Sequence, residues 1–325
     1  LFPGKAASAG SEVSAMAWRQ RFGWGAICAV AWVAMECLRG WMITGFPWNY
    51  LGGSQLDWTS IAMLAQFTGV LGVSLVVAWG SVGGLLVFWR WREQDRFEPA
   101  VLKDLAGPAA LLLVALGLGQ WALSQPLAER RGSLKIALVQ PAIPQTVLWN
   151  INDPVSQVDR FEHMMNLSDR AVAKEPDLLV WPEASLPPFW VLNPTNVIQR
   201  MGQLEQAIAE QGVWRGWGAD TATNNVPYNS AVLVPPEDSF LGELKKMKWP
   251  NYAKRHLVMF GEYVPFSEQL PFLKKLAPVG NFGRGGGEVV FDMGKAKTSV
   301  IICFEDVVPK LARRAATPEV DFLLN

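Results

Sequence analysis

Three segments of the chain carry side chains that could together perform acyl transfer. Glu183 ends the sequence WPE, Lys254 follows a Tyr-Ala pair, and Cys303 ends the apolar run VIIC. Nucleophilic acyl chemistry requires a thiolate, a carboxylate that takes and returns its proton, and a cation that stabilises the oxyanion. These three residue types meet that requirement without a histidine, and the chain contains only 2 histidines.

Each of these residues also has an ordinary structural explanation. Glu183 taken alone is typical of a solvated loop carboxylate, and Lys254 with Glu262 is typical of a loop with solvated charges. A cysteine at the end of a buried strand is usually an inert core thiol. However, the sequence changes abruptly to acidic residues after Cys303, which places this thiol at the polar edge of the core, where it can meet a base.

The segments around these residues alternate between apolar strand patterns and amphipathic helix patterns. Strands are expected at 134–140, 178–181, 230–234, 298–304 and 321–325, and helices at 156–175 and 197–212. Because the strand runs are continuously apolar, the sheet should be covered on both faces, which predicts an α/β fold. Pro182 ends the second strand and leaves Glu183 at its carboxyl edge, the usual position of ligand sites in such sheets.

The composition separates the chain into two parts. Of its 325 residues, 50% are hydrophobic and 18% are charged, which excludes a disordered chain. Only 15 of the 58 charged residues lie within residues 1–125, so this part is expected mostly in lipid and the remainder in water. Lys plus Arg and Asp plus Glu each total 29, and this zero net charge gives no electrostatic reason to expect a nucleic-acid partner.

Apolar segments predict three membrane crossings, at about 22–42, 69–89 and 105–125. We therefore expect a transmembrane region over residues 1–128 and a soluble domain over 132–325. Basic residues precede the first crossing and fill the loop between the second and the third, and such residues favour the cytoplasmic side. The soluble domain is then expected on the outer face of the membrane, which is the periplasmic side in a bacterium.

Glu36 and Arg39 lie near the end of the first crossing, three positions apart on one helical face. This spacing favours a mutually satisfied ion pair. A site for a lipid headgroup that includes Arg39 is the alternative.

Three consecutive glycines, Gly285 to Gly287, lie in the sequence GNFGRGGGEVVF. No helix that begins with Lys and Ser or Thr follows them, which argues against a phosphate-binding loop. A flexible lid over the acyl site and an ordinary glycine-rich turn both stay open.

The order of the segments WPE, YAKRHLVMFGEYVP and CFED resembles the Glu-Lys-Cys signature of the nitrilase superfamily. The longer sequences ECLRG, TGFPWNYLG, LVQPAIPQTVLW and KRHLVMFGEYVP resemble the apolipoprotein N-acyltransferase family, from about residue 36 to the end. The chain starts at Leu1 and stops at Asn325 after a strand-like run, and we expect it to be a fragment of a longer protein.

This resemblance implies an α-β-β-α sandwich for the soluble domain and roles for individual residues. Cys303 would be the nucleophile, Glu183 the general base and Lys254 the oxyanion stabiliser. The sequence matches further residues of the family's site, as pocket wall or support, at Trp149, Glu262 and Glu305, and Phe304 is expected to support the site as well. Phe304 stands where the family often has Tyr, and Met259 replaces a frequent Pro, but neither change removes a reactive group.

The family reaction proceeds in two steps in the bacterial inner membrane. A phospholipid donates an acyl chain to the cysteine as a thioester, and the free α-amine of a diacylglyceryl-cysteine on an apolipoprotein then accepts it. The reaction needs no cofactor, and the sequence has no Cys or His pair at metal-ligand spacing. Two alternatives stay open: a membrane-tethered amidase or nitrilase that uses water as the acceptor, and a non-catalytic membrane scaffold.

Overall fold

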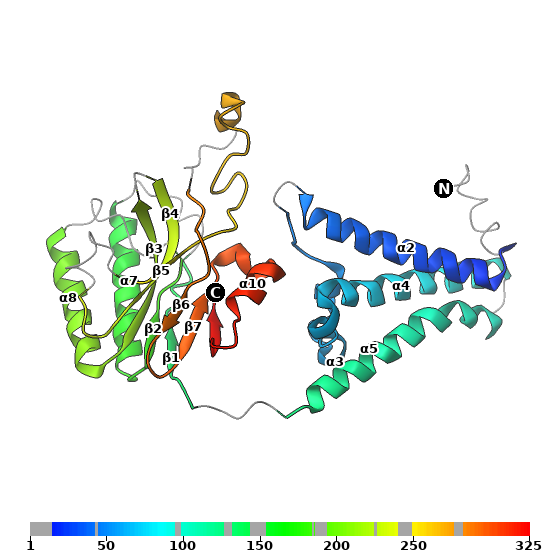
Figure 1. Ribbon diagram of the computed structural model, residues 1–325, viewed down its shortest axis with the longest axis horizontal. Helices are drawn as coiled ribbons and strands as arrows, with labels where there is room; N and C mark the ends of the chain where they lie inside the picture. The colour runs from blue at the N-terminus through cyan, green and yellow to red at the C-terminus, as the bar shows by residue number, and fades with distance from the viewer. Residues whose placement is uncertain are drawn as a thin grey trace. The chain divides into compact units, whose positions relative to one another are not determined.

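The computed structural model describes residues 15–42, 45–94, 99–126, 132–143, 154–183, 185, 194–223, 226–239, 249–275 and 282–325. The chain divides into two compact units, Leu1–Glu129 and Arg130–Asn325 (Figure 1). We call the first the helical unit and the second the sheet unit.

The helical unit contains three helices that are long and apolar enough to cross a membrane. The elements of this unit are α2 (Trp18–Arg39), η2 (Leu51–Gln55), α3 (Thr59–Ala62), α4 (Ala65–Gln94), η3 (Pro99–Leu105) and α5 (Ala106–Ser124). Helix α2 ends at Arg39, three residues earlier than the pattern predicts, because the chain turns at Gly40. Gly69 has a φ of 67° and interrupts α4 where the second crossing was expected to begin.

A buried group of charges joins the ends of three elements of the helical unit. Asp104 of η3 accepts a hydrogen bond from the Arg21 Nε of α2 at 2.9 Å and another from the Arg90 Nη1 of α4 at 2.8 Å. The Asp104 side chain is 0% exposed. A single carboxylate therefore fixes two arginines and, with them, two helix ends.

The expectation of a Glu36–Arg39 ion pair was wrong, because each side chain has other partners in the segment that follows α2. The Glu36 Oε1 accepts hydrogen bonds from the backbone N–H of Leu51 at 2.7 Å and from the indole of Trp32 at 3.2 Å. The Arg39 guanidinium lies over the Tyr50 ring, 5.4 Å from its centroid. Glu36 therefore holds the start of η2 against α2.

The sheet unit contains a five-stranded and a three-stranded sheet. The first sheet has the order β1 (Ile136–Leu138), β2 (Leu178–Val180), β3 (Trp214–Thr223), β4 (Val226–Val234) and β5 (Asn251–Ala253). Its first three strands are parallel, and β4 and β5 add antiparallel pairs. The second sheet consists of β6 (Val290–Asp292), β7 (Lys297–Val300) and β8 (Phe322–Leu324).

Each face of the five-stranded sheet packs on a different layer (Figure 1). Helices α7 (Pro154–Val172) and α8 (Pro194–Gln211) cover one face through a core that includes Met165, Ile208 and Trp217. The other face packs against β6, β7 and β8 through a second core that includes Phe291. Helix α10 (Pro309–Ala315) lies next to β7 on the far side, which confirms the expected α-β-β-α sandwich.

Strand β3 was absent from the strands predicted from the sequence, because its residues do not form an apolar run. Its site-facing positions include Gly216 and Gly218. A Cβ on Gly218 would lie 2.4 Å from the carbonyl oxygen of Pro182 and 2.7 Å from the Cα of Glu183. The glycine therefore allows the segment after β2 to lie directly against β3, and this close contact positions Glu183.

Candidate active site

Glu183 lies just beyond the carboxyl end of β2. The backbone N–H of Trp181 donates to the carbonyl of Gly216 at 2.8 Å, so the pairing with β3 extends to the residue before Pro182. The Glu183 side chain is 34% exposed, which leaves it open to a substrate and to water. The sequence prediction of a carboxylate at this edge is confirmed.

Lys254 follows β5 and is fixed from two directions. Its backbone N–H donates to the carbonyl of Asn229 on β4 at 2.8 Å. Its ammonium lies 2.8 Å from the Glu262 Oε1 and 3.4 Å from the Glu183 Oε1. The side chain is 1% exposed, so its charge is stabilised by these carboxylates rather than by water.

Glu262 belongs to a tight turn that returns its carboxylate to Lys254. The backbone N–H of Glu262 donates to the carbonyl of Val258 at 2.8 Å, and the Glu262 Oε2 accepts from the backbone N–H of Val258 at 2.8 Å. Phe260, at the tip, has a φ of 60°. The turn therefore holds Glu262 in one orientation by its own backbone.

Cys303 begins the short 3-10 helix η5 (Cys303–Val307) and has a φ of 53°. Two residues later, Glu305 is 0% exposed and holds this turn in place. Its carboxylate accepts hydrogen bonds from the Tyr252 hydroxyl and from the backbone N–H groups of three residues, which are Arg255, His256 and Ile302. Glu305 thus ties the turn that carries Cys303 to the segment that carries Lys254.

The charges around the site act on the Cys303 thiol in opposing directions. Partial burial raises the pKa of this thiol, and the Glu183 carboxylate raises it further by its charge and by accepting a hydrogen bond from the thiol. Lys254 and the backbone N–H of Phe304 lower it, but by less. The resting thiol is therefore protonated near neutral pH and would need a base in order to act as a nucleophile.

Lys254 remains a cation in spite of its burial. Burial disfavours the ammonium, but the hydrogen bond to Glu262 and the charges of Glu183, Glu262 and Cys303 outweigh it, and the pKa of Lys254 is raised. Burial also raises the pKa of Tyr252, as does the charge of Glu305, so Tyr252 stays a neutral hydrogen-bond donor.

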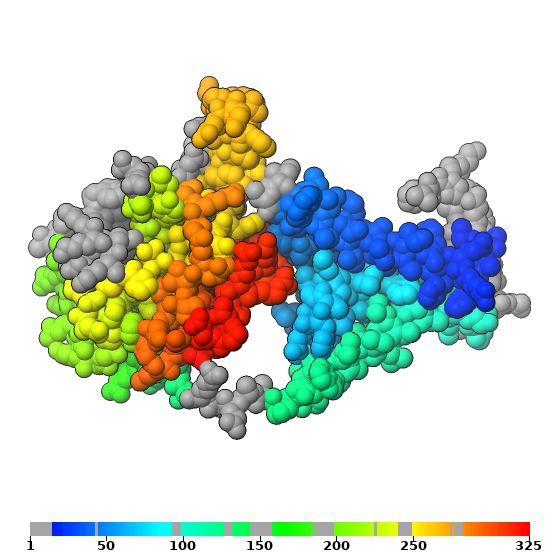
Figure 2. Space-filling model, viewed as in Figure 1, coloured from blue at the N-terminus to red at the C-terminus, as the bar shows by residue number. Residues whose placement is uncertain are grey.

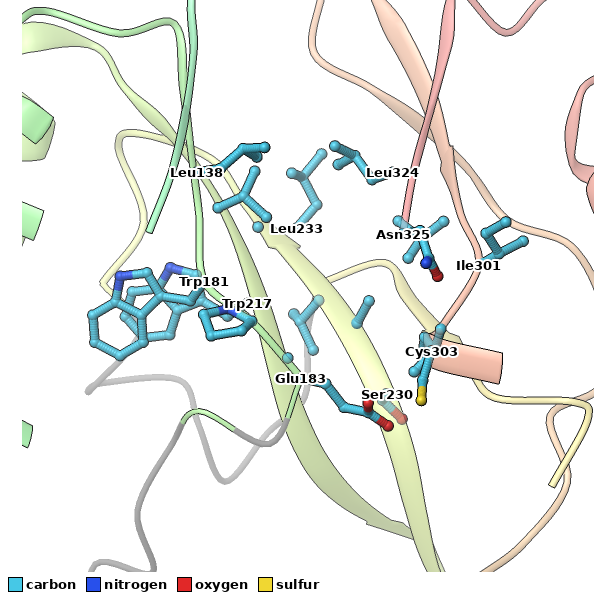
Figure 3. A pocket seen from close by; sticks show the side chains of 18 of the residues that line it. Leu138, Trp181, Glu183, Trp217, Ser230, Leu233, Ile301, Cys303, Leu324 and Asn325 are labelled. Carbon is cyan, nitrogen blue, oxygen red and sulfur yellow. The ribbon is translucent and has the colours of Figure 1, made fainter. Parts of the chain in front are cut away.

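A cavity of about 260 Å³ opens beside these groups, between the two sheets. Most of its lining is apolar and includes Leu138, Val180, Leu233, Phe291 and Leu324. The Glu183 carboxylate and the Cys303 sulfur lie at the same end of the cavity (Figure 3). The arrangement can accept an apolar group and present its reactive end to a thiol and a base.

The structure brings together four of the residues that the sequence singled out: Glu183, Lys254, Glu262 and Cys303. The Phe304 ring stacks on His256, with centroids 5.9 Å apart, while its backbone N–H approaches Cys303. Trp149 lies outside the described residues. Arg39 belongs to the helical unit.

Two polar residues of the site were missed by the sequence analysis. Asn229 donates to Glu183 at 2.5 Å and to Glu262 at 3.1 Å. Asp220 pairs with Asn229 across the β3–β4 ladder, and burial together with the charges of Glu183 and Glu262 raises the pKa of Asp220. The available signal was the sequence PYNSAVLV, in which Asn229 directly precedes the strand predicted at 230–234.

The three consecutive glycines differ from one another in their surroundings. The backbone N–H of Gly285 donates to the carbonyl of Lys254 at 2.9 Å, and a Cβ on Gly285 would lie 1.9 Å from the carbonyl oxygen of Ala253. A Cβ on Gly286 or on Gly287 would enter open space. Gly285 therefore supports the strand before Lys254, which is not the behaviour expected of a free lid residue.

The geometry suits nucleophilic acyl transfer. The thiol has a carboxylate that accepts its proton, and a buried ammonium lies close enough to stabilise negative charge at the reacting carbonyl. Among the described residues, no group of three or more His, Cys, Asp or Glu side chains could hold a metal ion.

Two family models match the chain. Residues 135–325 match the carbon-nitrogen hydrolase model, and residues 6–83 match the apolipoprotein N-acyltransferase N-terminal domain. Curated relatives named apolipoprotein N-acyltransferase include those of Geobacter metallireducens, 34% identical over 299 residues, and Vibrio vulnificus, 28% identical over 306 residues. Each match covers 90% of this chain and 54% of the relative, so the chain spans about half the length of the curated relatives it matches.

Among solved structures, an amidase from Nesterenkonia sp. is 20% identical, with a TM-score of 0.37. That match covers 62% of this chain and 66% of the amidase chain. The carbon-nitrogen hydrolase model matches more than half of this chain and includes Glu183, Lys254 and Cys303 in its range. The chain therefore belongs to the carbon-nitrogen hydrolase family.

Proposed function

We propose that this chain performs the reaction of an apolipoprotein N-acyltransferase. It would take an acyl chain from a phospholipid onto Cys303 and pass it to the α-amine of a diacylglyceryl-cysteine on an apolipoprotein. The observation that carries the proposal is the meeting of Glu183, Lys254 and Cys303 at one end of an apolar cavity. The match of residues 6–83 to the N-terminal domain of the same enzyme family supports it independently.

In the first step, the Cys303 Sγ attacks the ester carbonyl of the phospholipid as Glu183 takes the thiol proton. Lys254 stabilises the oxyanion of the tetrahedral intermediate by its charge. When this intermediate collapses, the ester C–O bond breaks and Glu183 gives the proton to the departing lysophospholipid oxygen. The products are a Cys303 thioester and a lysophospholipid.

In the second step, the acceptor amine attacks the thioester carbonyl. Glu183 takes a proton from the amine nitrogen, and the new C–N bond forms as the C–S bond breaks. The departing thiolate then recovers the proton from Glu183, which restores the resting site. The two steps use the same three residues, with Cys303 as the nucleophile of the first and the leaving group of the second, as a ping-pong reaction requires.

Two features support a lipid substrate in addition to the apolar cavity. The segment 264–275, which we call the arm, projects from the sheet unit (Figure 2) and exposes Phe266, Leu270 and Phe272. Exposed apolar groups on a projection are typical of a surface that meets lipid or another partner. The helical unit contains three helices of membrane-spanning length.

We assign residues 1–128 to a transmembrane region and residues 132–325 to the catalytic domain. The basic residues at the ends of the apolar helices favour the cytoplasmic side. The catalytic domain would then lie on the periplasmic side of the bacterial inner membrane. Trp149, Phe304 and Glu305 would form or support the pocket, and Arg39 would contact a lipid headgroup at the membrane surface.

A carbon-nitrogen hydrolase that transfers the acyl group to water is the second candidate. The family match over residues 135–325 and the 34% exposure of the Glu183 side chain favour it, because water can reach the base. The two candidates share the thioester and differ in the acceptor.

The test is intact-mass spectrometry of the full chain in detergent after incubation with phospholipid. The expected result is an acyl adduct that is absent in Cys303→Ala and that hydroxylamine releases. A diacylglyceryl-cysteine peptide should also remove the acyl group from the protein and carry it as an amide on its own α-amine. Cys37→Ala, which removes an exposed thiol of the helical unit, is the matched control and should keep the adduct. Release of the adduct as free fatty acid, with no peptide amide, would support the hydrolase.

A further inference from the structure

Asn229 completes a closed ring of hydrogen bonds in the active site. Its Nδ2 donates to the Glu183 Oε1 at 2.5 Å and to the Glu262 Oε1 at 3.1 Å. The Lys254 Nζ donates to the same two oxygen atoms, at 3.4 Å and 2.8 Å. Two donors therefore alternate with two acceptors around one ring, and each donor contacts both carboxylates.

The side-chain type at position 229 fits this ring closely. An amide group carries two N–H donors on one nitrogen and no charge. Asn229 is 7% exposed and therefore uses both donors where water has little access. A second cation at this position would neutralise both carboxylates, whereas the amide stabilises them and leaves the ring with one net negative charge.

The ring also determines which oxygen of Glu183 is available for proton transfer. Both ring donors contact the Oε1 of Glu183, so among the described residues its Oε2 is the oxygen that remains for the Cys303 thiol. On Glu262, by contrast, the Oε2 accepts from the backbone N–H of Val258. One carboxylate of the ring is thus engaged at both oxygens, while the other keeps one oxygen for chemistry.

The backbone at position 229 is fixed independently of the side chain. The Asn229 carbonyl accepts from the backbone N–H of Lys254, and β4 pairs with β5 at the next residue, Ser230. A substitution at Asn229 therefore removes the amide donors while the strand pairing that carries Lys254 remains. This separation makes the role of the side chain measurable.

We infer that Asn229 is a positioning residue that holds Glu183 as an ionised carboxylate, with its Oε2 directed to the Cys303 thiol. Asn229 does not touch the reacting carbonyl in this scheme, and it acts through Glu183. The inference rests on the proposed function only for the acyl-transfer step at Cys303. It concerns the activation of the thiol and not the identity of the donor or the acceptor.

The inference predicts a change in pH dependence. The ionisable groups around Asn229 are Glu183, Asp220, Lys254, Glu262 and Cys303. Loss of donors to the ionised form of a carboxylate makes that form less stable, so the acid side of the rate profile moves to higher pH. A hydrogen bond to a charged group is strong enough for a shift of about one to two pH units.

The experiment measures acylation of the full chain by p-nitrophenyl butyrate, an activated ester, as a burst of p-nitrophenol between pH 4 and 8. Asn229→Ala should move the acid side of the rate profile to higher pH by about one to two units. Asn229→Asp, which is nearly isosteric, should move it at least as far because a further carboxylate enters the ring. Asn229→Gln, which keeps the two donors, should recover part of the wild-type profile.

Thr221→Val is the matched control. Thr221 is a buried polar residue of β3, the strand paired with β4; its hydroxyl bonds to that of Ser230, and it does not line the cavity. This variant should lose some thermal stability and keep the wild-type pH profile. If Asn229→Ala and Asn229→Asp also keep the wild-type profile, and lose only rate or thermal stability, Asn229 has a purely structural role and the inference is overturned.

The burst with an activated ester separates this inference from the proposed function. A burst that requires Cys303 and shifts with Asn229 supports the inference, even if phospholipid gives no adduct. If Asn229→Ala fails to fold, the profile of Asn229→Asp decides. A phospholipid adduct that forms with the wild-type pH profile in Asn229→Asp would preserve the proposed function and reject the inference.

Discussion

The helical unit and the sheet unit each contain a cluster of three charges with a buried central residue, and the signs of the charges are reversed between the two clusters. In the helical unit, one carboxylate, Asp104, lies between Arg21 and Arg90. In the sheet unit, one cation, Lys254, lies between Glu183 and Glu262. Both clusters place the single charge at the centre, where it is almost fully buried.

The clusters differ in what surrounds the outer charges. Arg21 and Arg90 have side-chain exposures of 6% and 12%, so the whole helical cluster is enclosed. Glu183 is 34% exposed and borders a cavity that also contains a thiol. An enclosed cluster can only hold elements together, whereas an open one has a charged group that can exchange protons. The same kind of ion-pair network thus serves structure in one unit and, in the reaction we propose, chemistry in the other.

The largest expected effect comes from removing the central charge of the open cluster. Lys254→Met should reduce the rate of Cys303 acylation by about 10²–10³-fold, because the oxyanion loses its cation and the two carboxylates repel each other. Single-turnover acylation measures this. Lys295→Met removes an exposed lysine that pairs with Asp177 and should keep the wild-type rate. A similar loss in both variants would contradict the assignment.

Removing the central charge of the enclosed cluster should affect stability instead. Asp104→Asn leaves two buried arginines without a carboxylate and should lower the free energy of unfolding by about 3–5 kcal/mol. Thermal unfolding in detergent measures this, together with acylation per folded molecule, which should not change. Glu183→Gln should give the reverse result, with little loss of stability and no acylation. The comparison fails if Asp104→Asn is as stable as the wild type.

The glycine loop tests how the open cluster is supported. Gly285→Ala should lower the free energy of unfolding by about 1–3 kcal/mol and slow acylation, because its Cβ would meet the backbone carbonyl before Lys254. Gly286→Ala is the matched control, since its Cβ enters open space. Equal activity and stability in the two variants would show that Gly285 does not support Lys254.

The smallest expected effect is a shift in the titration of the Cys303 thiol. Glu183→Gln should lower the pKa of this thiol, because the carboxylate charge and its hydrogen bond raise it in the wild type. The rate of alkylation by iodoacetamide, followed by mass spectrometry as a function of pH, should therefore have a lower midpoint in the variant. A midpoint that rises would mean that another group controls the thiol.

Much of the fold was predictable because it follows from local apolar patterns. Each of the five expected strands overlaps a strand of the structure, and both expected helices of the sheet unit are present as α7 and α8. Strands β3, β5 and β6 were not predicted. Strand β3 could not be predicted, because the face that it turns to the site carries small residues that allow close backbone contact instead of apolar side chains. Gly218 is the clearest example, since its small size matters only when the segment around Glu183 lies against it.

The site was predictable to the extent that its residues end apolar strands or carry charge. Glu183, Lys254 and Cys303 stand out in this way, and the structure brings them together. Asn229 is neutral and lies inside a strand, so its sequence context resembles that of many structural asparagines. Its importance arises only when β4 places its amide between two carboxylates from distant parts of the chain.

The left-handed backbone at Cys303 sets the stability of this turn against the reactive group that it carries. A non-glycine residue with a φ of 53° costs about 1–2 kcal/mol relative to glycine, which adopts this conformation freely. The chain therefore keeps a side chain that weakens its own fold at the residue where the acyl group would be bound. Glycine at position 303 would relieve this strain but would remove the thiol, so the stability of the turn and its reactive group make opposite demands on this residue.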